Sequence, residues 1–284
     1  MTALSNESKL VNSKTEGPMT TLSTLNKFKK DGVKFTCLTC YDAMFARMMD
    51  KAQIDTILIG DSLGMVVQGH SSTLPVTVTD MAYHTSNVAR SNQHALIIAD
   101  LPFMSYVTLA EAITNSRQLM QAGAHVIKVE GGRELCELVT LLAQAGTPTC
   151  VHLGLTPQSV NVFGGYKVQG RGDLAAEKLL ADAQAVVTAG AAILVLECVP
   201  ADVAKAITES VNVPVIGIGA GAGTDGQVLV MHDMLGMAHG RVPRFVHDFL
   251  TDERNTSRSI EGAFALYQQS VRTGSFPTAQ HEFK

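Results

Sequence analysis

The feature that most constrains this 284-residue chain is a regular alternation of short apolar runs with amphipathic stretches. Such near-continuous apolar runs are typical of parallel strands that are covered on both faces. Seven clear runs occupy residues 34–40, 56–61, 95–100, 125–131, 148–154, 192–198 and 214–221. A weaker eighth run occupies residues 227–233. The spacing leaves room for a helix between most pairs of strands.

The stretches between these runs carry helical periodicity. One apolar stripe recurs with helical spacing at Leu135, Leu138, Val139 and Leu142. Strands that alternate with helices predict a parallel sheet, and eight such units predict a closed (β/α)₈ (TIM) barrel, an α/β fold. An open, doubly wound sheet is the alternative, although no G-x-G-x-x-G motif follows the first strand to indicate dinucleotide binding.

Composition limits the domain organisation and the partners. Hydrophobic residues make up 46% of the chain and charged residues 17%, so a large core is expected. The formal net charge is −4 without a basic stripe, which argues against nucleic acid or an anionic membrane as partner. Residues 1–21 are rich in Ser, Thr and Asn and are predicted to be a flexible extension. Residues 22–284 are predicted to form one barrel domain that ends in additional helices, including residues 259–273.

The five cysteines are predicted to be reduced. Their number is odd and the N-terminus lacks the apolar segment of a secretory signal, so a cytoplasmic location is expected. Cys37 and Cys40 have C-x-x-C spacing, which also occurs in zinc and redox sites. Because they fall within an expected strand, their side chains should point to opposite faces, which disfavours both of these functions.

Acidic residues terminate four of the apolar runs. They are Asp61, Asp100, Glu130 and Glu197. In a (β/α)₈ barrel the carboxyl ends of the strands form the face that carries the active site, so these side chains should converge. Alternation along a strand places Asp61 on the face of Ile57 and Ile59.

Alternation also places Lys128 on the same face as Glu130, so a cation is expected beside the acids. His152, near the end of the fifth run, is expected at the same mouth. Carboxylates that meet without a cation raise one another's pKa, and Mg²⁺ prefers such oxygen ligands. Asp61, Asp100 and Glu130 are therefore predicted to bind Mg²⁺. Each residue alone also fits a simpler role, as a helix cap, a salt-bridge partner or a partly buried histidine.

Two glycine-rich segments remain open to two interpretations each. Residues 217–226 (GIGAGAGTDG) could hold a phosphate on backbone N–H groups or could form a tight turn that needs positive φ. Residues 164–172 (GGYKVQGRG) could form a lid over the barrel mouth or an ordinary surface loop.

Long motifs that include these residues resemble the ketopantoate hydroxymethyltransferase family. The matching stretches are TCYDAMFA (39–46), IGDSLGMVVQGH (59–70), STLPVT (72–77), ADLPFMSY (99–106), KVEGG (128–132), HLGLTPQSVNVFGGYKVQGR (152–171), VLECVP (195–200) and PVIGIGAGAGTDGQVLVMHDMLG (214–236). The resemblance covers roughly residue 21 to the C-terminus. It implies a barrel of the phosphoenolpyruvate/pyruvate type that assembles into a large homo-oligomer, often a decamer.

The resemblance also implies the reaction and a role for each site residue. A hydroxymethyl group would pass from 5,10-methylenetetrahydrofolate to 3-methyl-2-oxobutanoate through a Mg²⁺-stabilised enolate, giving 2-dehydropantoate on the route to pantothenate. The implied metal ligands are Asp61, Asp100 and Glu130, and the implied general base is Glu197. The implied contacts to the 2-oxo acid come from Asp61, Ser62, Asp100 and Lys128. From its position we add His152 to these contacts, and we expect Lys128 to stabilise the developing negative charge.

Two other functions stay open. A Mg²⁺-dependent C–C lyase of the isocitrate-lyase type would also bind a 2-oxo acid, but such enzymes typically use a loop cysteine and residues 164–172 contain none. A catalytically silent barrel would lack at least one of the charged site residues, and all of them are present.

Overall fold

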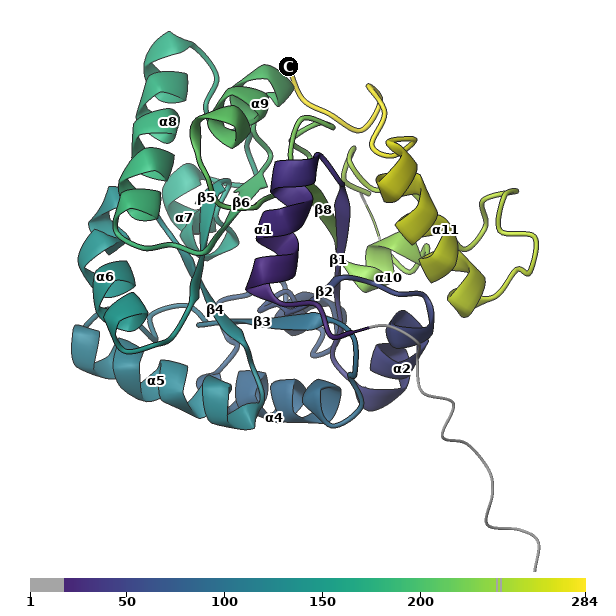
Figure 1. Cartoon of the computed structure of the whole chain (residues 1–284), viewed down its shortest axis with the longest axis horizontal. Coiled ribbons are helices and arrows are strands. Elements are labelled where there is room, and N and C mark those ends of the chain that lie inside the picture. Colours follow the sequence, from purple (N-terminus) through teal and green to yellow (C-terminus); the bar gives the residue numbers. More distant parts are fainter. Residues whose placement is uncertain (1–17, 239, 241) are drawn as a thin grey trace, which may run out of the picture.

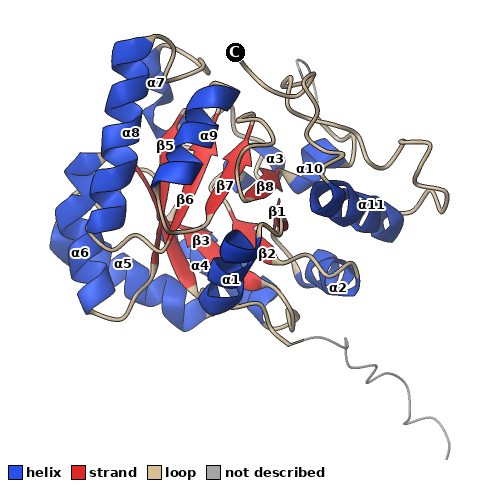
Figure 2. Ribbon diagram, turned by 45° about the horizontal axis from the view of Figure 1, so that its top comes forward, coloured by secondary structure: helices blue, strands red, loops and turns tan. Residues whose placement is uncertain are grey.

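The computed structural model describes residues 18–238, 240 and 242–284, and they form a closed barrel of eight parallel strands in sequential order (Figures 1 and 2). The strands are β1 (Phe35–Thr39), β2 (Thr56–Ile59), β3 (Leu96–Asp100), β4 (Val126–Glu130), β5 (Thr149–Gly154), β6 (Ile193–Glu197), β7 (Val215–Ile218) and β8 (Gly226–Leu229). Pairing of β1 with β8 closes the barrel. The predicted fold is confirmed, and the open-sheet alternative is wrong. Most of the predicted extension, residues 1–17, lies outside the described residues.

Helices surround the barrel on its outer side (Figure 2). They are α2 (Ala43–Lys51), α3 (Leu63–Val66), α4 (Val78–Ala89), α5 (Leu109–Ala122), α6 (Cys136–Gln144), α7 (Val160–Phe163), α8 (Asp173–Thr188), α9 (Ala201–Ser210), α10 (Met231–Met234) and α11 (Ile260–Thr273). The apolar stripe expected on α6 is buried at Leu138, Val139 and Leu142. Within residues 242–284, α11 is the one α-helix, so fewer C-terminal helices form than the sequence suggested.

The eighth unit departs from the expected pattern. The apolar run 227–233 is half strand and half helix, because β8 ends at Leu229 and α10 begins at Met231. No helix separates β7 from β8 either. The chain turns back within residues 219–225, where Gly219 and Gly221 adopt φ angles of 60° and 74°. Glycine adopts such angles without steric cost, which makes the short return possible.

Apolar side chains fill both the barrel interior and the layer between strands and helices. Cys37 belongs to the interior cluster and Cys40 to the outer one, as their opposite strand faces predicted. Helix α1 (Leu22–Asp31) lies across one end of the barrel (Figure 1), and its fully buried Leu25 joins the interior cluster. The amide of Thr20 donates to the carbonyl oxygen of His94 at 2.6 Å, so ordered contacts begin before the predicted boundary at residue 22.

The expected side-chain alternation does not extend from β2 to Asp61. In β2, Ile57 and Ile59 pack outward against the helices, whereas Leu58 points into the barrel. Asp61 does not share a strand face with these isoleucines because β2 ends at Ile59 and a turn follows. This turn, and not strand alternation, brings Asp61 to the barrel mouth.

Candidate active site

The carboxyl ends of the strands carry a buried cluster of acids. Asp100, Glu130 and Glu197 are the last residues of β3, β4 and β6. Asp61 follows β2 by two positions. Asp61, Asp100 and Glu130 are buried, whereas the side chain of Glu197 keeps 16% of its surface exposed. The structure thus brings together the residues that the sequence singled out on four strands.

Lys128 lies between two of these acids. Its Nζ is 2.8 Å from Asp100 Oδ2 and 3.5 Å from Glu130 Oε1. Burial alone would lower the pKa of Lys128, but the surrounding carboxylates, Asp100 foremost, raise it well above its ordinary value. Burial would raise the pKa of Glu130, but Lys128 and then His152 outweigh it and hold that pKa below the ordinary value. Lys128 is therefore a fixed positive charge among the carboxylates.

His152 lies between Glu130 and Glu197. Its Nδ1 lies 3.1 Å from Glu130 Oε1, and its Nε2 lies 3.4 Å from Glu197 Oε2 without hydrogen-bond geometry. Burial favours the neutral imidazole, but the charge of Glu130 outweighs it and raises the pKa of His152 to about 9. A protonated ring can donate from both nitrogens, so His152 can approach Glu197 as well as bind Glu130.

Asp61 is the least compensated acid of the cluster. Its backbone N–H donates to Asp100 Oδ2 at 3.1 Å, and its own Oδ2 accepts from Gln158 Nε2 at 2.9 Å. Burial, followed by the charges of Glu130 and Asp100, raises the pKa of Asp61 well above its ordinary value. A further positive charge at this point would favour ionised Asp61.

Sequence reasoning missed Gln158 and Tyr106. Gln158 is buried in the short 3₁₀ turn Pro157–Ser159 that follows β5, and Tyr106 lies in the loop that precedes α5. The Tyr106 hydroxyl donates to Gln158 Oε1 at 2.6 Å. The available signal was position, since both residues lie in loops that follow a strand at the barrel mouth.

Ser62 and the segment 164–172 complete the surroundings of the acids. The Ser62 hydroxyl lies 2.8 Å from the hydroxyl of Tyr41. In the glycine-rich segment, Tyr166 donates its hydroxyl to Met65 Sδ at 3.7 Å. The pKa of Tyr166 is raised by burial, then by the negative charges of Glu197 and Asp61. The segment therefore lies beside the acids, where the lid interpretation requires it.

The donor set fits a hard cation. Asp100 Oδ1 is a buried carboxylate oxygen without a hydrogen-bond partner, and such an atom is costly unless something binds it. Among the described residues no three His, Cys, Asp or Glu side chains form a ready ligand set. Mg²⁺ does not require one, because it commonly binds one or two carboxylates and fills its octahedron with water and substrate. Asp61 and Asp100 fit this role, and the hydrogen-bonded Glu130 adds negative charge beside them.

Other parts of the chain occupy the space beside the glycines of segment 217–226. A Cβ on Gly219 would lie 2.8 Å from the Phe245 ring, and one on Gly221 would lie 2.6 Å from Ala201 Cβ. These close approaches and the positive φ angles favour the tight-turn interpretation over a phosphate site.

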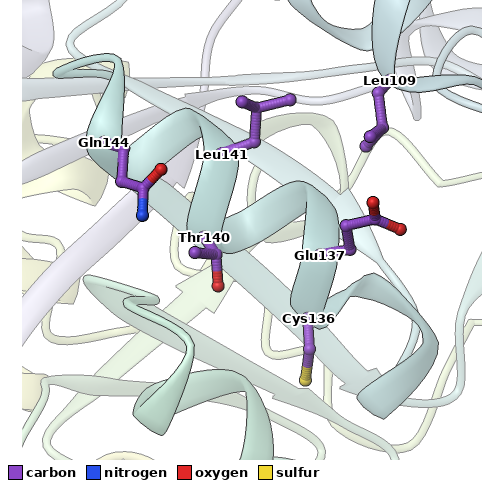
Figure 3. A pocket seen from close by; sticks show the side chains of 6 residues that line it. All are labelled: Leu109, Cys136, Glu137, Thr140, Leu141 and Gln144. Carbon is purple, nitrogen blue, oxygen red and sulfur yellow. The ribbon is translucent and has the colours of Figure 1, made fainter.

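Two surface cavities lie near α6. The first, of about 370 Å³, is lined by the α6 side chains that Figure 3 labels and by Leu109, and it contains none of the predicted site residues. The second, of about 400 Å³, includes Glu130 and Gln158 in its lining together with Phe103 and Tyr106. It therefore borders the acid cluster. None of the described helices is long and apolar enough to cross a membrane.

Sequence comparison identifies relatives along nearly the whole chain. The model of the family described as ketopantoate hydroxymethyltransferase matches residues 19–279. A 3-methyl-2-oxobutanoate hydroxymethyltransferase of Psychrobacter arcticus is 86% identical over 93% of this chain and 100% of its own length. The protein of the same name from Acinetobacter baylyi is 58% identical over 94% of this chain and 99% of its own.

Solved structures with lower sequence identity share the fold. Phosphonopyruvate hydrolase in complex with oxalate and Mg²⁺ superposes with a TM-score of 0.58 at 13% identity, covering 75% of this chain and 81% of that one. A 2,3-dimethylmalate lyase of the PEP mutase/isocitrate lyase superfamily gives 0.55 at 15% identity, covering 75% and 81%. At such identities the likeness concerns the barrel alone.

Proposed function

Because this chain belongs to the ketopantoate hydroxymethyltransferase family, we propose that it transfers a hydroxymethyl group from 5,10-methylenetetrahydrofolate to 3-methyl-2-oxobutanoate, giving 2-dehydropantoate. The observation that carries the proposal at atomic level is the buried cluster of Asp61, Asp100, Lys128 and Glu130, with Glu197 at its accessible edge. The product would enter the route to pantothenate.

The chain's own groups can bind and orient the 2-oxo acid. We assign its carboxylate and ketone oxygens to the region of Asp61, Ser62, Asp100 and Lys128. The Lys128 ammonium is buried and already held by Asp100, so it needs no rearrangement to stabilise negative charge on the substrate. Tyr166 and its loop would exclude water from this region.

Glu197 is the proposed general base. It is the most exposed of the strand-end acids, so a substrate at the mouth can reach it, and His152 lies 3.4 Å away to orient it. Its carboxylate would remove the proton from C3 of 3-methyl-2-oxobutanoate, and a C–C bond to the one-carbon unit would form. Water would supply the hydroxyl oxygen. Both C–N bonds of the methylene bridge of 5,10-methylenetetrahydrofolate would break, and the two nitrogens would take up protons from solvent as tetrahydrofolate leaves. The proton would remain on Glu197 until solvent removes it.

Asp61 and Asp100, assisted by Glu130, would hold the cofactor Mg²⁺. When bound, the ion would polarise the ketone and so acidify the neighbouring C–H bond. The orphan oxygen of Asp100 and the uncompensated charge of Asp61 support this assignment.

Substitution Glu197→Gln tests the base assignment. We expect loss of C3–H exchange into deuterated water by at least about 100-fold, because general-base catalysis contributes this much. Mg²⁺ affinity, measured by calorimetry, should stay unchanged. The matched control is Glu209→Gln on α9, an exposed site that should leave exchange intact. Wild-type exchange rates in the Glu197 variant would refute the assignment.

A C–C lyase that acts on a 2-oxo acid is the less supported alternative. The barrel likeness to 2,3-dimethylmalate lyase does not discriminate, because one fold supports many reactions. Product formation that depends strictly on 5,10-methylenetetrahydrofolate would favour the transferase. Cleavage of a branched hydroxy acid without folate would favour the lyase.

We also propose that the protein works in the cytoplasm as a homo-oligomer of ten copies. The reduced state of Cys37, Cys40, Cys136, Cys150 and Cys198 is consistent with that compartment. Exposed apolar side chains such as Met104, Val107 and Val162 offer surface for subunit contacts. Light scattering on the purified full chain would measure the number of subunits.

A further inference from the structure

We infer that Gln158 is a positioning residue, whose carboxamide holds the Asp61 carboxylate in the orientation in which Asp61 and Asp100 receive the divalent cation. The inference rests on the proposed function, since it presumes a cation at these two acids. It assigns a role to Gln158, a residue that takes no part in the proposed chemical steps.

All polar atoms of Gln158 that face the acids are used. Nε2 donates to Asp61 Oδ2 and to the carbonyl oxygen of Leu101, both at 2.9 Å. The backbone N–H of the same residue donates to Glu130 Oε2 at 3.0 Å. One buried residue after β5 thus connects the ends of β2, β3 and β4.

Tyr106 fixes which end of the amide faces Asp61. Its hydroxyl donates to Gln158 Oε1 at 2.6 Å and accepts from the backbone N–H of Glu130 at 3.3 Å. Since Tyr106 donates to the oxygen and the carbonyl of Leu101 can only accept, both amide hydrogens point toward Asp61 and Leu101. Asp61 has therefore one oxygen held by a neutral donor, and its other oxygen is left for a ligand.

A glutamine suits this position better than the similar residues. A glutamate would place an oxygen against Asp61 Oδ2 and the Leu101 carbonyl, where two acceptors repel each other. A leucine would keep the volume but leave Asp61 Oδ2 without its donor. Partners of this kind orient metal ligands, and their removal typically weakens metal binding by 10- to 100-fold.

Mg²⁺ titration calorimetry on the full-length protein tests the inference, with thermal unfolding recorded in parallel. For Gln158→Leu we expect the Mg²⁺ Kd to rise by roughly 10- to 100-fold. Tyr106→Phe keeps the amide but frees its orientation, so a rise of roughly two- to tenfold is expected, the worth of about one hydrogen bond. The control Gln144→Leu, on the outer surface of α6 (Figure 3), should bind Mg²⁺ like the wild type.

The possible outcomes distinguish the proposed Mg²⁺ cofactor from the positioning role of Gln158. A wild-type protein that binds no Mg²⁺ would overturn the proposed cofactor, and the inference with it. A wild type that binds Mg²⁺ beside a folded Gln158→Leu variant with a Kd within about twofold of it would overturn the positioning role alone. If Gln158→Leu does not fold, Tyr106→Phe decides, and an unchanged Kd in that variant would overturn the role.

Discussion

At the scale of single residues, the site is a problem in charge compensation. Lys128 and a protonated His152 face the carboxylates of Asp61, Asp100 and Glu130, all of them buried. Two positive charges do not neutralise three negative ones, and after burial, which is the largest cause, the neighbouring carboxylates raise the pKa of Asp61 further. Removing Lys128 or His152 should destabilise the fold, because an unpaired buried charge destabilises a protein far more than the absence of the whole ion pair does.

Substitution Lys128→Met should therefore destabilise the fold. We expect a loss of about 3–5 kcal/mol in the free energy of unfolding, the usual cost of breaking a buried ion pair from one side. Urea unfolding monitored by circular dichroism would measure it. Lys27→Met, which removes an exposed ion pair with Asp31, should cost less than about 1 kcal/mol. Equal effects of the two variants would contradict the description of Lys128 as a buried charge.

Asp233 gives a prediction of pH dependence at the same scale. Burial raises the pKa of this half-buried carboxyl from 3.8 to about 6. The folded state thus prefers the protonated form, and the stability gained from it is complete below pH 3.8 and lost as the pH rises through about 6. Asp233→Asn should raise Tm relative to wild type at pH 7–8, and the gain should vanish toward pH 4.

The corresponding free energy is at most about 3 kcal/mol, and solvent contact at this half-buried site reduces it. Differential scanning fluorimetry between pH 4 and 8 would follow the gain, with Asp202→Asn on the exposed side of α9 as control. A pH-independent difference between Asp233→Asn and wild type would contradict the raised pKa.

At the scale of elements, the two ends of the barrel have different tasks. The carboxyl ends of the strands carry the acids, whereas α1 closes the opposite end with Leu25. The capping box of Thr21 and Thr24 begins this helix, and Gly32 in a left-handed conformation ends it. Helix α1 therefore contributes to the barrel core at the end that lies opposite the acids.

Leu25→Ala should open a cavity under the barrel interior. We expect a loss of about 2–5 kcal/mol, as for other fully buried leucines. Thermal or urea unfolding would measure it, while kcat should change little because the acids lie at the other end. Leu174→Ala, at a side chain that is 83% exposed, is the matched control and should change stability by less than about 0.5 kcal/mol.

At the scale of the whole molecule, the C-terminus returns to the barrel mouth (Figure 1). Phe283 forms a bridge with Pro200, and its carbonyl oxygen accepts from the N–H of Ala201 at 3.0 Å. The carbonyl oxygen of Lys284 accepts from Arg171 at 3.1 Å. The last residues thus hold both the loop that follows Glu197 and the segment 164–172.

Deletion of residues 280–284 should loosen that loop. We expect kcat/KM to fall by up to about 100-fold, since a displacement of about 1 Å at a catalytic group costs this much. The Tm should fall by only a few degrees, because none of the deleted residues is fully buried. Steady-state kinetics beside fluorimetry would separate the effects, and wild-type kcat/KM would show that the tail does not support the site.

Much of this arrangement could be predicted from local pattern. The apolar runs predicted the bounds of the strands to within a few residues. Side-chain alternation placed Cys37 and Cys40 correctly on opposite faces. The prediction that Asp61 shares a strand face with Ile57 and Ile59 was wrong, because β2 ends at Ile59 and a turn precedes Asp61. The return between β7 and β8 stayed open between a tight turn and a phosphate site, since the same glycine pattern occurs in both.

The sequence by itself determined the strand order, the acids at the strand ends and the family, because these depend on periodicity and on residue identity along the chain. Only the tertiary structure decided that Gln158 and Tyr106 belong to the acid cluster, that Asp61 arrives by a turn, and that the C-terminus supports the mouth. Hydrogen bonds such as that from Gln158 to Asp61 join residues 97 positions apart. No local pattern encodes such a contact, since it depends on where barrel closure places the two loops.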